Sequence, residues 1–574
     1  MSPGRAASGQ LGGTRTPARP ASRVRVSPGW AVVWTLAAVV PLVFLAIFFV
    51  WPVAALVAKG FFPDGTPSLA GFEQVFTAQR TWRIVRQTLT QAVAGTIVSV
   101  LLGVPGAYVL YRTRFPGRAV VRAFVTIPFV LPTVVVGVAF KTLLASSGPL
   151  GFLGLDETWA AIIAALIFFN YSVIVRTVGG LWGRLDPRLG EAARVLGASP
   201  ARVFATVTLP ALAPAIASGA AIVFLFCASA YGIVMVLGGV SFGTIETEIW
   251  YQTTQLLNLP AASALSIVQL VLVTASLLVA NRMQARQQRA HRLLTDDRGE
   301  RRWSWRRDWA ASLVTFLLVA GLLVTPLAYL AFRSVWTPSG FSLQYYRLLA
   351  TTGEGALVIP VWTAAAYSLR IALGATLLAV GLGLAVSFVV SRRPRSALGR
   401  GTLRALDSFF MLPLGVSAVT VGFGFLITLN RPPLDLRSSF VLVPIAQAIV
   451  ALPLVVRSLL PVLRAIDPRQ REAAATLGAS PWRVLATIDG PLALRGLGLA
   501  TGFAFATSLG EFGATSFLSR PNAATLPVVI FELIGRPGAQ NYGMAMAASV
   551  LLALMTGVVM ALAERLRPSE ATGW

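Results

Sequence analysis

Two segments of this 574-residue chain carry almost the same sequence at a fixed distance. Residues 191–203 read EAARVLGASPARV and residues 472–484 read EAAATLGASPWRV, so the offset is 281 residues. The same offset pairs identical residues well outside this motif: Pro132 with Pro413, Arg176 with Arg457, Asp186-Pro187 with Asp467-Pro468, Gly232 with Gly513, and Thr244 with Thr525. An internal repeat this long predicts that the chain is two versions of one structural unit.

The composition is that of a membrane protein. Hydrophobic residues make up 56% of the chain and charged residues only 12%, whereas soluble domains carry about 25% charged residues. The segment 30–58 contains no charge, and about 20 apolar residues suffice for a helix to cross a bilayer. Because lipid offers no hydrogen-bond partners, the spans must be helical. We therefore expect an all-α, polytopic membrane protein.

The apolar runs predict about twelve transmembrane helices, six in each half. In the first half they lie near 30–57, 88–110, 120–144, 159–180, 211–238 and 261–281; in the second, near 309–332, 365–390, 406–429, 438–461, 495–517 and 544–564. An even number of spans gives both halves the same orientation, as in a parallel repeat. We expect a tail at 1–28, a first repeat at 29–283, a linker at 284–308, a second repeat at 309–566 and a C-terminal tail at 567–574.

The net charge of +26 comes almost entirely from arginine, and its distribution predicts the orientation. Arginines are dense in alternate loops and in the N-terminal tail. Cytoplasmic loops carry such an excess of positive charge, so both termini are expected in the cytoplasm. Arg80, Arg83 and Arg86 do not fit, because they fall on the expected outer side. We interpret the charge as membrane topology rather than as nucleic-acid binding, since there is no aromatic-rich basic domain.

The repeated motif lies in expected cytoplasmic loops between the fourth and fifth span of each half. Asp186-Pro187 and Asp467-Pro468 form a cap-and-proline helix start in front of each motif. Gly197 and Gly478 then end the short helix, because glycine adopts backbone angles that other residues resist. Each motif is thus expected to be a short helix, a glycine turn and a second helix.

These motifs resemble the loop of permease subunits of ATP-binding-cassette importers. The pattern is Glu-Ala-Ala, three residues, Gly and, about a dozen residues later, Pro. The resemblance implies that the loops couple the permease to ATPase subunits through Glu191, Ala192, Ala193, Gly197, Glu472, Ala473, Ala474 and Gly478. The second copy departs from the pattern at Asp489-Gly490-Pro491, where a hydroxyl or apolar residue and leucine are usual before the proline.

The segments LGEFGATSFLSRPNAATLP from Leu509 and LGGVSFGTIETEIW from Leu237 are similar to fused permeases of ferric-iron and thiamine importers. That resemblance implies the type-I importer fold in a prokaryotic plasma membrane. It also implies two cytoplasmic ATPase subunits and an extracytoplasmic solute-binding protein as partners. Importers of sulfate, molybdate or polyamine, and more remotely a secondary transporter, remain alternatives.

The sequence offers no site for chemistry of its own. It contains no Gly-Lys pair and therefore no phosphate-binding loop of the type G-x-x-x-x-G-K-[ST], so a separate subunit must hydrolyse ATP. With one histidine and one cysteine, we expect no metal site, cofactor or enzymatic activity. Charges within spans are costly and often mark function. We therefore name Glu511 as a candidate for the transport pathway, together with the polar Asn170.

Overall fold

A computed structural model describes residues 28–565, except 64, 240, 291–299, 393–395, 431, 433 and 438. Residues 1–27 of the expected N-terminal tail, the expected C-terminal tail 567–574 and residues 291–299 of the expected linker therefore lie outside the described residues. The described chain is helical apart from two small two-stranded pairings. β1 (Thr113–Arg114) pairs in parallel with β2 (Arg301–Arg302), and β3 (Trp336–Thr337) pairs antiparallel with β4 (Gly340–Phe341).

The first half contains thirteen α-helices within the described residues: α1 (Pro28–Leu45), α2 (Trp51–Phe61), α3 (Ala70–Thr77), α4 (Gln79–Arg112), α5 (Arg118–Thr126), α6 (Thr133–Leu144), α7 (Trp159–Trp182), α8 (Arg188–Val195), α9 (Pro200–Val203), α10 (Leu209–Ala228), α11 (Gly232–Leu237), α12 (Ile245–Thr254) and α13 (Leu259–Ala290). The second half contains α14 (Trp305–Leu317), α15 (Thr325–Val335), α16 (Gln344–Leu348), α17 (Val361–Val390), α18 (Ala397–Phe410), α19 (Ala418–Thr428), α20 (Leu442–Arg464), α21 (Pro468–Thr476), α22 (Pro481–Val484), α23 (Gly490–Gly510), α24 (Thr515–Leu518), α25 (Leu526–Gly535) and α26 (Ala539–Arg565).

Four π-helical segments in the described chain join consecutive helices: η1 (Ala46–Val50), η4 (Phe204–Thr208), η5 (Leu318–Val324) and η7 (Leu485–Asp489). Each ends just before a helix that carries proline in its first two positions. Proline donates no backbone hydrogen bond and clashes with the preceding turn, so the backbone widens there instead of continuing as a regular α-helix. Short 3₁₀ segments complete the helical elements: η2 (Ile127–Phe129), η3 (Gly151–Leu153), η6 (Leu412–Gly415) and η8 (Pro521–Ala523).

Within the described residues, nine helical segments are long and apolar enough to cross a membrane. A tenth is obtained if the bent segment from Pro481 to Gly510 counts as one span. The chain is thus an all-helical polytopic membrane protein, as the sequence predicts.

The two remaining expected spans, 120–144 and 406–429, are not single helices. The first is divided into α5, η2 and α6, and the second into α18, η6 and α19. The breaks lie at Pro128, Pro132 and Pro413, where the ladder of backbone hydrogen bonds cannot continue. The repeat therefore reproduces even the break, because Pro132 and Pro413 are separated by the same 281 residues.

Equivalent helices of the two halves pack in the same way. In the first half α4, α7 and α10 pack against one another, and α13 packs on α10. In the second half α17, α20 and α23 do the same, and α26 packs on α23. The largest apolar core joins the halves, since it includes residues from α6 and α12 as well as from α19, α25 and α26.

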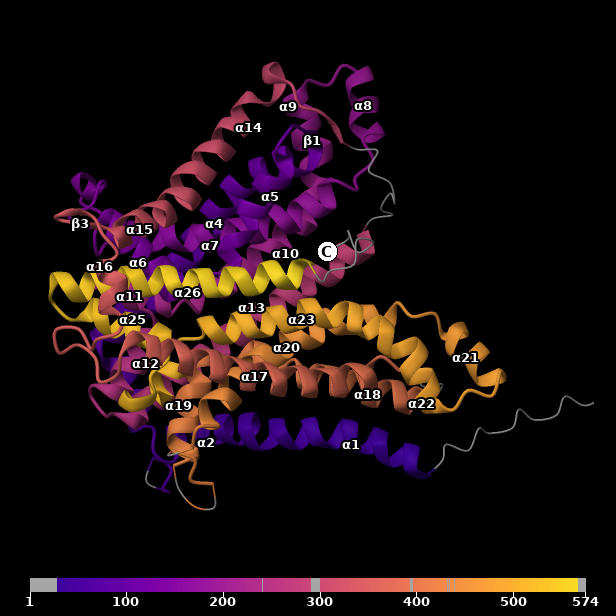
Figure 1. The fold of residues 1–574 in the computed structure, drawn as a ribbon. Coiled ribbons are helices and arrows are strands. Elements are labelled where there is room, and N and C mark those ends of the chain that lie inside the picture. The colour runs from indigo at the N-terminus through magenta and orange to yellow at the C-terminus, as the bar shows by residue number, and fades with distance from the viewer. Residues whose placement is uncertain are drawn as a thin grey trace, which may run out of the picture.

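The first long helix of each half lies against the other half. α1 packs on α17 and α2 on α19, whereas α14 packs on α4 and α15 on α6 (Figure 1). Each half thus packs its first long helix against the other half, and these helix–helix contacts hold the two halves together. Figure 1 also shows α8 and α21 at one end of the molecule, the end toward which α26 runs, and α11, α16 and α25 at the opposite end. We refer to these as the loop end and the far end.

Candidate functional site

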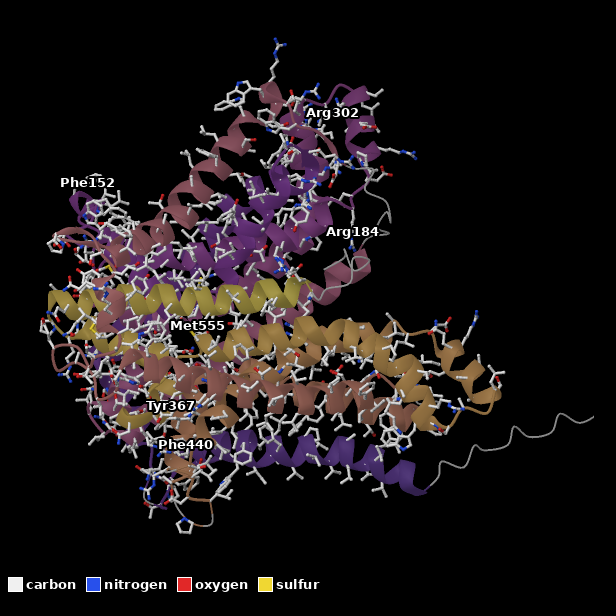
Figure 2. All side chains as sticks on the ribbon, in the orientation of Figure 1. Phe152, Arg184, Arg302, Tyr367, Phe440 and Met555 are labelled. Carbon is white, nitrogen blue, oxygen red and sulfur yellow. The ribbon has the colours of Figure 1, made fainter. Side chains whose placement is uncertain are left out.

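Two short helical hairpins, α8–α9 and α21–α22, project at the loop end of the molecule (Figure 1). The side chains of Asp186 and Asp467 accept the backbone N–H groups of Arg188 and Arg469 at 3.0 and 2.9 Å. These bonds satisfy donors that every helix start leaves free. The expected caps are therefore present in both copies. Figure 2 shows Arg184, two residues before the first cap, at this same end.

The turn between the helices of each hairpin depends on glycine. Gly197 and Gly478 have φ angles of 85° and 80°, in the left-handed region. The next amide bonds back into the first helix, from Ala198 to the oxygen of Ala193 and from Ala479 to the oxygen of Ala474, at 3.0 and 2.9 Å. A side chain at either glycine would strain this turn. The two hairpins thus share one backbone geometry.

The tip of each hairpin exposes an apolar side chain. Leu196 and Leu477, which are equivalent in the repeat, are each 88% exposed. Glu191 and Glu472 are exposed on the short helices α8 and α21, which end directly before these leucines. A single exposed leucine is common on a protein surface, but here a leucine is exposed to the same extent at the same position of both hairpins.

The second hairpin is tied to the membrane-spanning helices by a buried carboxylate. Asp489 is fully buried and accepts hydrogen bonds from Arg471 Nε at 2.7 Å and from Arg392 Nη2 at 3.2 Å. The Arg392 guanidinium also lies over the ring of Trp34 in α1, 4.4 Å from its centre. Burial lowers the pKa of the Arg392 guanidinium, and the charge of Asp489 opposes that effect. Asp489, at which the second copy departs from the family pattern, therefore makes a structural contact.

The first hairpin is attached differently. Phe204 lies 6.2 Å from the buried Trp182 at the end of α7, and Trp182 lies 5.4 Å from Tyr108 in α4, measured between ring centres. Tyr108 in turn donates a hydrogen bond to the buried Asp308 of α14 at 2.8 Å. Aromatic packing therefore stands between the first hairpin and the helices, and Arg112 at the end of α4 also donates a hydrogen bond to the oxygen of Leu185, just before the hairpin, at 3.3 Å.

At the far end the two halves meet through a pair of aromatic rings. Tyr231 and Phe512 stack with their ring centres 5.3 Å apart and their planes 26° apart. They are equivalent in the repeat, since 231 plus 281 is 512. The Tyr231 hydroxyl lies 3.0 Å from Ser516 Oγ, and Phe531 packs on Phe512 at 5.3 Å. Equivalent positions of the two halves therefore contact each other at this point.

Glu511, a candidate from the sequence, lies directly beside this stack. Its carboxylate accepts the backbone N–H groups of Ala514 at 2.7 Å and Thr515 at 3.0 Å, and also the Thr515 hydroxyl. These bonds hold the start of α24 after the break that follows α23. These hydrogen bonds give Glu511 a structural role. A role of Glu511 in the transport pathway stays a prediction.

We expect Glu511→Gln to destabilise the protein, because an amide supplies only one acceptor oxygen where the carboxylate supplies two. Hydrogen bonds to charged groups are worth about 1.5–3 kcal/mol each, so the loss is about 2–3 kcal/mol. Thermal unfolding in detergent measures this loss. The exposed Asp435, which pairs with its neighbour Arg437, supplies the control as Asp435→Asn. Unchanged unfolding with lost uptake would instead assign Glu511 to the pathway.

Asn170, the other candidate, is buried within α7. Its amide nitrogen donates to the oxygen of Leu166 at 2.9 Å and lies 3.4 Å from the sulfur of Cys227 in α10. It therefore joins two helices of the first half. For Asn170, too, a role in the pathway stays a prediction. Among the described residues, no group of histidine, cysteine, aspartate and glutamate is placed to hold a metal ion.

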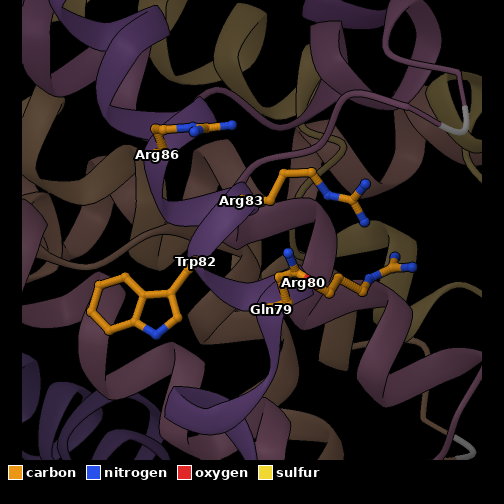
Figure 3. Close-up of a pocket in the computed structure, with 5 residues that line it drawn as sticks. All are labelled: Gln79, Arg80, Trp82, Arg83 and Arg86. Atoms are coloured by element: carbon orange, nitrogen blue, oxygen red, sulfur yellow. The ribbon is translucent and has the colours of Figure 1, made fainter.

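The three arginines that did not fit the charge pattern lie at the start of α4. Arg80 pairs with the buried Glu248 at 3.0 Å and lies over the ring of Tyr251. Arg83 and Arg86 are exposed and line a surface hollow together with Trp82 (Figure 3). Arg80 is thus fixed by a structural ion pair.

Comparison with known proteins identifies the family. Residues 95–292 match the model described as "Binding-protein-dependent transport system inner membrane component". The sulfate transport system permease protein CysT of Escherichia coli K12 is 31% identical over 270 residues, covering 46% of this chain and 95% of CysT. The chain belongs to this family. It is an inner-membrane permease of a binding-protein-dependent ATP-binding-cassette importer, and it is not itself catalytic.

The similarity of this permease to thiamine permeases extends over most of the chain. The thiamine transport system permease protein ThiP of Brucella abortus strain 2308 is 27% identical over 504 residues, covering 85% of this chain and 88% of ThiP. ThiP of Escherichia coli K12 is also 27% identical, over 82% of this chain and 87% of its own length. A chain of a bacterial alginate importer aligns with 46% of the permease at 20% identity, with a TM-score of 0.39.

The structure of the permease leaves the predicted residues apart. Glu191 and Glu472 lie on separate hairpins at one end, and Glu511 lies near the other end. Tyr231, Phe512 and Asp489 were not among the residues predicted from the sequence. The offset of 281 residues pairs Tyr231 with Phe512 beside the repeated Gly232 and Gly513, and this pairing was the available indication.

Proposed function

We propose that this permease is the fused membrane subunit of a thiamine-type importer, in which two parallel six-helix repeats form the pathway. The proposal counts the broken segments 118–144 and 397–428 as the third span of each half. With these segments and the bent segment, the nine long helices of the described chain become twelve spans. The domain boundaries at 29–283 and 309–566 follow from the same assignment, and the identical packing of α4, α7, α10 and α17, α20, α23 supports it.

We propose that the hairpins α8–α9 and α21–α22 are the surfaces on which two cytoplasmic ATPase subunits dock. The observation that carries this proposal is the matched pair Leu196 and Leu477, each 88% exposed at the tip of an identical hairpin. Two equal docking surfaces at one end of the molecule fit a motor made of two subunits. The family implies ATPase partners, and the number follows from the two hairpins.

The loop end is then cytoplasmic, and both termini lie on that side. Arginine-rich segments support this orientation, since Arg112, Arg114 and Arg118 lie from the last residue of α4 to the first residue of α5. The far end faces the solute-binding protein. Cargo released there meets the stacked Tyr231 and Phe512, so we propose that this stack closes the outer end of the pathway.

Alternating access follows from these two ends. ATP-driven closure of the ATPase dimer would bring the hairpins together and separate the halves at the Tyr231–Phe512 contact. A partner can shift such an equilibrium only by binding one state more tightly than the other. In this permease the hairpins are the surfaces that would transmit this difference in affinity.

The substrate is proposed from the length of the similarity, because the thiamine permeases match 82–85% of the chain. The test is uptake of labelled thiamine into proteoliposomes that contain the permease, its ATPase and its binding protein. We expect ATP-dependent thiamine uptake that vanadate abolishes, with no uptake of ferric iron. Uptake driven by an ion gradient without ATP would instead indicate a secondary transporter.

Sulfate is the second candidate, because CysT shows higher identity over the part it matches, 31%. That match covers 46% of the permease, whereas ThiP matches both halves. Uptake of labelled sulfate into the same proteoliposomes, compared with uptake of labelled thiamine, decides between the two substrates.

A further inference from the structure

The two hairpins share a backbone geometry, but they are attached to the membrane helices by different kinds of contact. The second hairpin is held by Asp489 between two arginines, at 2.7 and 3.2 Å. The first hairpin has Thr208 at the position equivalent to Asp489, since 489 minus 281 is 208. The positions equivalent to Arg471 and Arg392 are Gly190 and Tyr111. The first half therefore lacks all three charges at these positions.

These differences matter because the two kinds of contact resist motion unequally. The Asp489 carboxylate is fully buried and has charged partners on both oxygens. Pulling it away would leave a buried charge unpaired, which is far more costly than stretching a contact between apolar groups. The first hairpin rests on the rings of Phe204 and Trp182, whose packing has no fixed hydrogen-bond direction. Arg112 adds a hydrogen bond to the backbone oxygen of Leu185 at 3.3 Å, but no buried carboxylate among the described residues is held there between two arginines.

The charged contact also joins three parts of the chain: the second hairpin, the end of α17 and α1. Arg471 is on the helix α21 of the hairpin itself, next to Glu472. Arg392 follows α17, and its guanidinium covers the ring of Trp34 in α1. The side chain of Asp489, at the end of η7, therefore connects the hairpin to α17 and, through Arg392, to the helix that crosses from the first half.

A small apolar cluster lies beneath this contact. Leu463, Ile466 and Ala493 are buried together, with Phe388, Ile488 and Leu492 packed around them. Ile488, which packs against this cluster, directly precedes Asp489, and Asp489 itself is fully buried. In that setting the hydrogen bonds to its charge are stronger than they would be in water.

We propose that Asp489 is a positioning residue that locks the second hairpin rigidly to the transmembrane helices, while the first hairpin can pivot. The inference rests on the proposed docking function of the hairpins. The two ATPase subunits would then be coupled unequally to the transmembrane helices. Force applied to α21 passes directly to α17 and α1, whereas force applied to α8 is partly absorbed by movement at the aromatic contact.

Hydrogen exchange of the permease alone, in nanodiscs and without ATPase, tests the lock. We expect the amides of 470–484 to exchange about tenfold or more slowly than the equivalent amides of 189–203, because local opening must break the buried charge contacts. Arg471→Gln keeps the pair of Asp489 with Arg392 and is expected to fold. It should accelerate exchange of the second hairpin and leave the first unchanged.

Asp489→Asn is the stronger variant and should bring the two hairpins to similar exchange rates. Its matched control is Thr208→Asn at the equivalent position, for which we expect no change in either hairpin. Equal exchange of both hairpins in the unmodified protein would overturn the inference. So would a second hairpin whose exchange does not respond to Arg471→Gln.

A second measurement separates this inference from the docking proposal. Cysteines introduced at Leu196 and Leu477 are cross-linked to the ATPase subunits in the assembled complex. Absence of both cross-links would refute docking and leave the exchange result standing. If docking holds, Arg471→Gln should reduce the amount of cargo transported per ATP hydrolysed. An unchanged ratio of cargo to ATP would overturn the proposal that the two hairpins are coupled unequally.

Discussion

Uptake should fall to background when Glu191 and Glu472 are both changed to lysine. The two glutamates are exposed on the short helices that end directly before the apolar tips Leu196 and Leu477 of the projecting hairpins. Placing like charges opposite each other in an interface costs several kcal/mol, so two reversals reduce ATPase affinity by more than about 100-fold. Co-purification of the ATPase with the permease and uptake in proteoliposomes measure the effect.

The folded state of this double variant is checked by its thermal unfolding, which should be unchanged. The matched control is Glu73→Lys, which reverses an exposed glutamate in α3 rather than in a hairpin. It should retain the ATPase fully. Normal uptake by the double variant would refute the docking role of the hairpins.

Removing the ring of Phe512 should open the outer end of the pathway. In Phe512→Ala the stacking on Tyr231 and the contact with Phe531 are both lost. Truncation of a buried phenylalanine typically costs about 3–5 kcal/mol of stability. The share of this free energy that comes from the contact between the halves is lost only in the state whose outer end is closed, so that state is destabilised. We therefore expect ATP hydrolysis without the binding protein to rise by about tenfold or more, which needs a shift of only about 1.4 kcal/mol.

The conservative variant Phe512→Tyr serves as the control, because it retains the ring and makes the two equivalent positions identical. It should keep hydrolysis low without the binding protein. A Phe512→Ala permease that folds normally and still hydrolyses ATP only with the binding protein would exclude the stack as the outer closure. Accessibility of a cysteine at Ser516, which lies 3.0 Å from the Tyr231 hydroxyl, reports opening independently.

The local structure of the hairpins was predictable because it depends on neighbouring residues. The capping aspartates, the left-handed glycines and the serines that begin α9 and α22 act within a few positions of one another. Ser199 and Ser480 each accept the amide three residues later at 3.3 Å. The repeat also predicted that the two hairpins would have the same backbone structure.

The attachment of the hairpins was not predictable from the pattern alone. Asp489 was recognisable only as a departure from the family sequence, and its partner Arg392 lies 97 residues away. Similarly, the stack of Tyr231 on Phe512 requires the halves to face each other at that point. Local rules carry no information about which distant helix ends meet.

By itself, the sequence determined the class of the protein, because hydrophobic runs in lipid must form helices and a 281-residue repeat must give two similar units. It also determined the hairpins, whose caps and turns are satisfied locally. Only the tertiary structure decided that α1 and α14 cross to the opposite halves, that Tyr231 stacks on Phe512, and that Asp489 is buried between two arginines. Those outcomes depend on the packing of segments far apart in the chain, which settles where each apolar face and each buried charge finds its partner.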